Sequence, residues 1–75
     1  MPMDWKVILG RNILRLRSDR KWSQQDLACH AELSVRFLSG VERGEENPSM
    51  DTLISIANAL DIPPWKLLYE DARAL

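Results

Sequence analysis

Apolar residues recur every three or four positions along most of the chain, and no stretch alternates apolar and polar residues as a strand does. The clearest case is Leu53, Ile56, Ala57 and Leu60, which follow the i, i+3, i+4, i+7 spacing of a core-facing helix. Five helices are predicted, at about residues 4–20, 23–31, 34–43, 49–60 and 65–69. The fold class is therefore expected to be all-α.

The first predicted helix carries one charged residue on its apolar face. Trp5, Leu9, Ile13 and Leu16 form its core stripe, and Arg17 projects into the same apolar sector. A buried guanidinium needs an acidic partner, because an unpaired buried charge is strongly unfavourable. We therefore expect an Asp or Glu from another element to meet Arg17.

Capping residues mark where the other helices begin and end. Ser23, Ser34 and Ser49 each stand where an N-cap is expected, and Ser23 with Asp26 has the capping-box spacing. Gly44 follows the third helix as the favoured residue just past a C-terminus. No repeat or linker interrupts the pattern, so residues 1–75 are predicted to form one domain.

The third helix has only a thin apolar stripe, made by Leu38 and Val41. The opposite face presents small or polar residues one turn apart, namely Arg36, Ser39, Gly40 and Arg43. Such a face suits a helix that lies in a groove, where two arginines reach phosphates or base edges. An ordinary solvated helix face is the alternative.

The net charge of −1 conceals an asymmetry along the chain. Residues 1–44 hold eight Lys or Arg against five Asp or Glu, whereas residues 45–75 hold two against six. This division suggests that one face meets an anion, although scattered surface charge would give the same totals.

Several function classes are disfavoured by the composition. No apolar run approaches the roughly 20 residues of a membrane span, and the start MPMDWKVILG lacks the features of a secretion signal, so a cytoplasmic location is expected. Cys29 is the single cysteine, and a helix points it about 100° away from His30. We therefore expect no metal site, no cofactor, no small-molecule ligand and no enzymatic activity.

Several linked motifs carry a family resemblance over about residues 9–68. They are Leu9-Gly10, Leu16-Arg17, Ser23-Gln24, Leu27-Ala28, Leu38-Ser39, Val41-Glu42-Arg43-Gly44, Asn47-Pro48-Ser49, Thr52-Leu53 and Ile56-Ala57. In this order they resemble the Cro/phage-repressor (XRE-like) helix-turn-helix family. The resemblance implies a compact five-helix, lambda-repressor-like domain with its helix-turn-helix at about residues 23–43.

The same resemblance implies roles at the matching positions, with double-stranded DNA as the partner. The DNA-binding residues would be Gln24, Gln25, Ser34, Val35, Arg36, Phe37, Ser39, Gly40, Arg43 and Asn47. Gln24 would direct its amide at a phosphate, and Phe37 would either pack half-buried or touch a sugar or thymine methyl group. It also implies a structural ion pair between Arg17 and Glu42, which supplies the expected acidic partner.

The chain departs from the family pattern at four positions. Glu32 and Lys21 stand where the family often has Gly, and we expect both turns to require a left-handed backbone that a side chain disfavours by roughly 1 kcal/mol. Glu45 and Glu46 replace the basic residues often found near DNA. We expect this acidic pair to weaken phosphate contact there or to discriminate between sites.

The C-terminal segment is too apolar for one short helix with one buried face. We expect a homodimer interface within about residues 59–75, formed by Ala59, Ile62, Trp65, Leu68 and Tyr69. The alternative is a monomer in which Trp65 folds onto Trp5.

Together these features predict a sequence-specific transcriptional regulator that binds a pseudo-palindromic operator as a homodimer. A stand-alone domain of this size resembles the controller proteins of restriction–modification systems. The alternatives are a small prophage or antitoxin-type repressor, or a helix-turn-helix scaffold for protein–protein contact.

Overall fold

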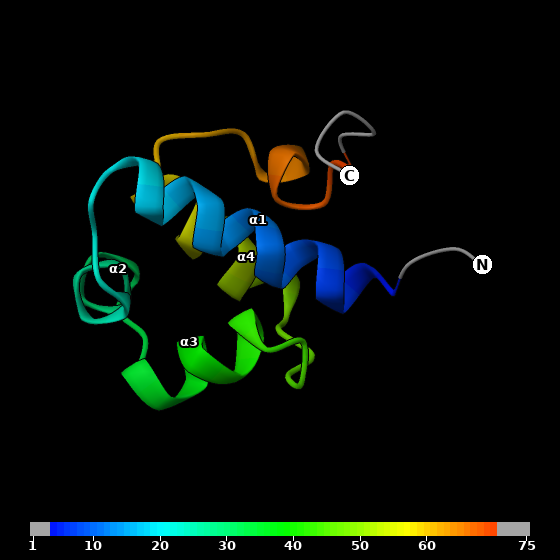
Figure 1. Cartoon of the computed structure of the whole chain (residues 1–75), viewed down its shortest axis with the longest axis horizontal. Helices are drawn as coiled ribbons and strands as arrows, with labels where there is room; N and C mark the ends of the chain where they lie inside the picture. Colours follow the sequence, from blue (N-terminus) through cyan, green and yellow to red (C-terminus); the bar gives the residue numbers. More distant parts are fainter. Residues whose placement is uncertain (1–3, 71–75) are drawn as a thin grey trace.

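Four α-helices and one 3₁₀ helix lie within residues 4–70, the part of the chain that the computed structural model describes. In chain order they are α1 (Trp5–Asp19), α2 (Gln24–Ala31), α3 (Val35–Glu42), α4 (Met50–Ala59) and the 3₁₀ helix η1 (Pro64–Leu67) (Figure 1). No described residue forms a strand, which confirms the all-α prediction. The count of five α-helices is not confirmed, because the last segment is a short 3₁₀ helix without a side-chain cap.

Each α-helix begins after a residue whose side chain caps its first turn. Ser23, Ser34 and Ser49 each accept a hydrogen bond from the backbone N–H three residues later, at 3.0, 3.0 and 3.2 Å. Asp4 caps α1 by accepting a hydrogen bond at 3.0 Å from the backbone N–H of Lys6, two residues later. The Asp26 carboxylate accepts the Ser23 N–H at 2.9 Å and completes the capping box. These bonds satisfy N–H groups that have no partner within the helix.

Among residues 4–70, three non-glycine residues hold the left-handed backbone conformation in the turns. They are Lys21, Glu32 and Asp61, with φ of 60°, 58° and 57°. The first two are the positions where a left-handed turn was predicted, and Asp61 adds a third at the end of α4. Each costs roughly 1 kcal/mol relative to glycine, so packing of the helices on both sides must compensate for this strain.

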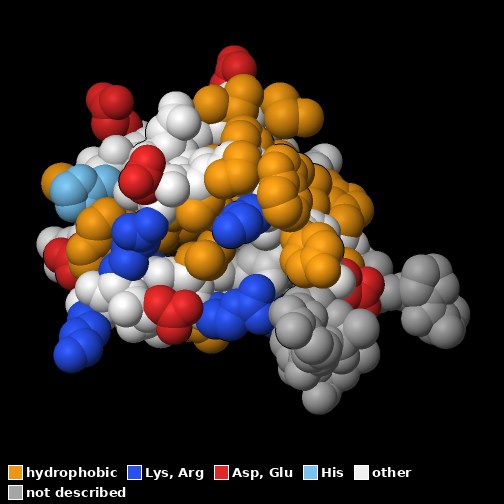
Figure 2. Space-filling view, turned by 90° about the horizontal axis from the view of Figure 1, so that it is seen from above, with side chains coloured by type: hydrophobic (Ala, Val, Ile, Leu, Met, Phe, Trp, Pro, Cys, Tyr) orange, Lys and Arg blue, Asp and Glu red, His pale blue; other side chains and the backbone are white. Residues whose placement is uncertain are grey.

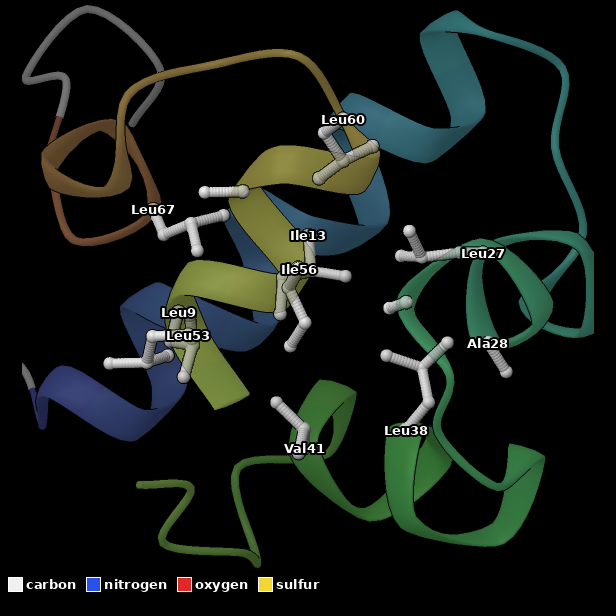
Figure 3. Packing of buried hydrophobic residues seen from close by; sticks show 12 residues of the cluster. Leu9, Ile13, Leu27, Ala28, Leu38, Val41, Leu53, Ile56, Leu60 and Leu67 are labelled. Atoms are coloured by element: carbon white, nitrogen blue, oxygen red, sulfur yellow. The ribbon is translucent and has the colours of Figure 1, made fainter. Parts of the chain in front are cut away.

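The core draws on all five helices. Its fully buried large side chains are Leu9, Ile13, Leu27, Leu38, Val41, Ile56, Leu60 and Leu67. Figure 3 shows Leu38 and Val41 pointing away from α3 toward the centre of the molecule, and Leu67 joining from η1. The placement of Trp5 in the core stripe is wrong: Trp5 is 40% exposed. It lies in the first turn of α1, one turn before Leu9, where the helix extends past the core.

Helix α1 runs through the middle of Figure 1, with α3 on one side and η1 on the other. Gly10 permits the close approach of α1 to α3, because a Cβ at this position would collide with the Glu42 carbonyl group and lie 2.9 Å from the Val41 carbonyl oxygen. Within the described residues, no helix is both long and apolar enough to cross a membrane.

Candidate nucleic-acid interface

Helices α2 and α3 form a helix-turn-helix whose turn is closed by backbone bonds. Glu32 ends α2 in the left-handed conformation, and the Leu33 N–H donates to the Ala28 carbonyl at 2.8 Å. Ser34 then caps α3. The three-residue connection fixes the direction of α3, so the second helix projects from the body of the domain at a set angle.

Helix α3 is anchored by one edge and open along the other. Leu38 and Val41 are fully buried, whereas Val35 is 41% exposed. Arg36 and Arg43 are also exposed, and Ser39 is half-buried between them. Phe37 is half-buried against the core, which matches the packing alternative predicted for it. The exposed edge therefore presents two guanidinium groups on a helix that cannot rotate without losing core contacts.

The predicted site residues differ in how accessible they are. Gln25, Ser34, Val35, Arg36, Arg43 and Asn47 are exposed, Gln24, Phe37 and Ser39 are half-buried, and Gly40 is buried. The interpretation of Gly40 as an outward-facing position is wrong. A Cβ there would lie 2.7 Å from Cγ of Glu46, so the loop after α3 covers this glycine.

Arg17 and Glu42 form the ion pair that the sequence predicted. Arg17 donates from Nε to Glu42 Oε2 at 2.6 Å and from Nη2 to Oε1 at 2.9 Å. A third bond runs from Nη1 to the Trp22 carbonyl at 3.0 Å. The hydrogen bond to Glu42 raises the pKa of Arg17 above its usual value, with burial opposing it. This bidentate pair joins α1 to the last residue of α3.

Gln24 belongs to the same network. Its Nε2 atom donates to Glu42 Oε1 at 3.0 Å, so one amide N–H of Gln24 is used within the protein. The predicted role of this amide toward phosphate therefore rests on its second N–H. Gln25, the next residue in the first turn of α2, is exposed.

Arg43 is held by two neighbours at the end of α3. Its Nη1 donates to Ser39 Oγ at 2.5 Å, and its Nε and Nη2 both lie 3.1 Å from Glu45 Oε1. The Arg43 and Glu45 side chains are 56% and 62% exposed. Arg43 and Arg36 thus differ in their ion pairing, because no described Asp or Glu pairs with Arg36.

One buried polar residue was missed by the sequence analysis. Asn12 is 5% exposed, and its Nδ2 donates to the carbonyl groups of Leu67 at 2.8 Å and Tyr69 at 2.9 Å. Arg15 donates to its Oδ1 at 3.1 Å. The signal was present, since Asn12 stands beside Ile13 within the apolar stripe of α1. A buried amide must find partners, and here it fastens the C-terminal segment to α1.

In the part of the chain that the structure describes, no three His, Cys, Asp or Glu side chains, Cys29 and His30 included, are grouped so that they could hold a metal ion. Cys29 is exposed, and the His30 ring stacks on Trp22 with centroids 4.5 Å apart. Trp22 in turn is half-buried against the core, and its ring centroid lies 5.6 Å from the Arg20 guanidinium carbon.

The helix-turn-helix family model matches residues 13–64, which include all of α2, α3 and α4. The chain belongs to the helix-turn-helix family. Proteins of this family are transcriptional regulators rather than enzymes, and the chain is a DNA-binding regulator of this type.

Similar proteins include both restriction–modification controllers and a phage repressor. Control protein C.SmaI from Serratia marcescens is 39% identical over 66 residues, covering 88% of this chain and 79% of the relative. The immunity repressor protein of Bacillus phage phi105 is 43% identical over 65 residues, covering 87% of this chain but 45% of the relative. The controller protein C.AhdI from Aeromonas hydrophila superposes with a TM-score of 0.80 and 37% identity, covering 83% of this chain and 94% of that structure.

Proposed function

We propose that the protein is a cytoplasmic, sequence-specific regulator that inserts α3 into the major groove of a pseudo-palindromic operator as a homodimer. The main support is that the side chains of Val35, Arg36 and Ser39 lie on the accessible edge of α3, whose opposite edge is buried. An arginine at such a position can donate two bonds to a guanine edge, and Val35 can contact a thymine methyl group. Gln25 and Ser34 lie at the helix starts, where phosphates are commonly bound.

The C-terminal segment supports the dimer. Trp65, Leu68 and Tyr69 are 60%, 41% and 53% exposed, whereas Ala59 and Ile62 are half-buried against the core. Trp65 meets the Tyr69 ring edge-on at 6.0 Å, and within residues 4–70 no ring contact joins it to Trp5. Figure 2 shows hydrophobic side chains gathered on the face that includes η1. Residues 71–75 of the predicted interface lie outside the described residues.

The dimer is tested by sedimentation of Trp65→Ala. This substitution removes the most exposed aromatic ring of the segment and should shift the protein toward monomer at micromolar concentration. Leu14→Ala, which removes an exposed apolar side chain from α1, serves as the control. Equal sedimentation of wild type and Trp65→Ala would refute an interface centred on this residue.

We further propose that the regulated genes belong to a restriction–modification system. The similarity to C.SmaI and C.AhdI supports this assignment. The identity to the phi105 immunity repressor supports a prophage repressor as the second candidate. Neighbouring genes for an endonuclease and a methyltransferase would favour the controller, and phage structural genes would favour the repressor.

Selection of bound duplexes from a random pool is the decisive experiment for DNA recognition. The expected result is one enriched sequence with two half-sites about 34 Å apart, the spacing of one helical turn. Affinity should fall steeply with salt, by about 0.9 in the log–log slope for each neutralised phosphate. Absence of binding to any duplex at low salt would refute the proposal and favour a scaffold for protein–protein contact.

A further inference from the structure

The loop after α3 is fixed to that helix by its backbone. The Gly44 N–H donates to the Val41 carbonyl at 3.0 Å, and the Glu45 N–H donates to the Gly40 carbonyl at 2.9 Å. With Gly44 at φ 76°, these bonds form a Schellman motif. Glu45 is therefore held beside the C-terminus of α3, where the helix dipole disfavours a negative charge.

The side chain of Glu45 pairs with the solvent-exposed guanidinium of Arg43. Its Oε1 accepts from both Nε and Nη2 of Arg43, each at 3.1 Å. With the Ser39 bond, each nitrogen of the Arg43 guanidinium has a partner. Both side chains of the ion pair are more than half exposed, so the pair is weak enough to be exchanged for another anion.

A second carboxylate lies against the same helix. The Glu46 side chain fills the space above Gly40, with Oε2 3.1 Å from the place a Cβ would occupy. Gly40 is one turn after Arg36 and one position after Ser39, and it is buried beneath the Glu46 side chain. Two negative charges therefore border the proposed recognition surface.

We propose that Glu45 is a specificity-determining residue that withholds Arg43 from non-cognate DNA. A phosphate held at hydrogen-bond distance, as in a fully seated complex, displaces the carboxylate and receives Arg43. A loosely docked duplex holds no phosphate at that distance, so Arg43 stays paired and contributes no phosphate contact. Glu46 adds repulsion in the same place. The inference rests on the proposed function, because it requires α3 to face DNA.

The test measures binding against salt for wild type and Glu45→Gln, on a random-sequence duplex and on a duplex recovered by selection. On the random duplex, the variant should bind about 3- to 5-fold more tightly at 0.1 M salt, and its log–log slope should steepen by about 0.9. On the selected duplex the slope should stay unchanged, because Arg43 already contacts phosphate there. Asp19→Asn is the control, since it makes the same charge change at the exposed end of α1, away from α3 in Figure 1.

A second background shows whether Glu45 acts through Arg43. In Arg43→Ala protein, adding Glu45→Gln should leave the slope on the random duplex unchanged. A slope in Glu45→Gln equal to that of Asp19→Asn would overturn the inference, as would the same steepening in the Arg43→Ala background. Failure of the proposed function is distinguishable, because wild type would then bind neither duplex.

Discussion

Replacing Glu42 with alanine should destabilise the fold more than removing the exposed charge of Arg36 from the same helix. Glu42 is the last residue of that helix, and its carboxylate accepts from Arg17 and Gln24 together. The Arg17 and Glu42 side chains are only 13% and 6% exposed. Removal of the carboxylate leaves a guanidinium in a largely closed site with the Trp22 carbonyl as its one remaining partner among the described residues.

The size of the destabilisation follows from the cost of leaving one member of a buried ion pair without its partner. Truncating one member of a buried ion pair costs about 3–5 kcal/mol, and the residual exposure of Arg17 places this pair near the lower end. A chain of 75 residues has a total stability of about 4–11 kcal/mol. A loss of about 3 kcal/mol should lower the melting midpoint by roughly 12–24 °C.

Thermal melting followed by circular dichroism measures the effect, with Glu45→Ala as the matched control. Glu45 also pairs with an arginine beside the end of α3, but its side chain is 62% exposed, so its loss should cost at most about 1 kcal/mol. The double variant Arg17→Met with Glu42→Leu should recover much of the stability, because it leaves no unpaired charge. If Glu42→Ala melts no lower than Glu45→Ala, the pair does not stabilise the fold and the reasoning is wrong.

Three further predictions concern other parts of the domain. Gly10→Ala should destabilise the fold by about 2 kcal/mol or more, because the new Cβ meets the backbone of α3. Gly40→Ala should be neutral or stabilising, because the flexible Glu46 side chain can move aside. Chemical denaturation of the two variants measures both free energies of unfolding. Backbone and side-chain hydrogen bonds from Ser23 lower the pKa of Asp26 in the folded protein. The Asp26 carboxylate therefore stabilises the fold above about pH 4, and this stabilisation is lost as the pH falls through the lowered pKa. In Asp26→Ala, the melting midpoint should fall less steeply with decreasing pH than in wild type. Arg36→Ala should cost about 1–3 kcal/mol of binding to the selected duplex and little on random DNA, and an equal loss on both in a titration would assign Arg36 to phosphate instead.

Local signals were enough to predict where the helices begin and which faces they bury. Ser23, Ser34 and Ser49 cap the helices that they were expected to cap, because an N-cap bond spans three residues and needs no distant partner. The predicted core position of Trp5 was wrong, and the count of five α-helices was not confirmed, for the opposite reason. Whether the first turn of α1 is buried, and whether η1 continues as an α-helix, depends on which distant segments pack there.

Among the site residues too, those with a local signal were predictable and those that depend on distant packing were not. Arg17 was predictable because a charge inside an apolar stripe demands a partner, and Glu42 borders the same core. The cover over Gly40 was not predictable, because it depends on how the loop folds back after Gly44. Glu45 was noticed as an anomaly of composition, but its pairing with Arg43 required the geometry of that loop.

Helix α1 makes no proposed contact with DNA, yet it fixes both surfaces on which the proposed function depends. Gly10 sets its backbone against α3, and Arg17 fastens it to the end of that helix. On its other side, Asn12 holds the segment that carries Leu67 and Tyr69. In the proposed dimer, the separation of the two recognition helices is therefore transmitted through α1. Substitutions at Gly10 or Asn12 should alter the preferred half-site spacing, an effect that loss of stability alone would not produce.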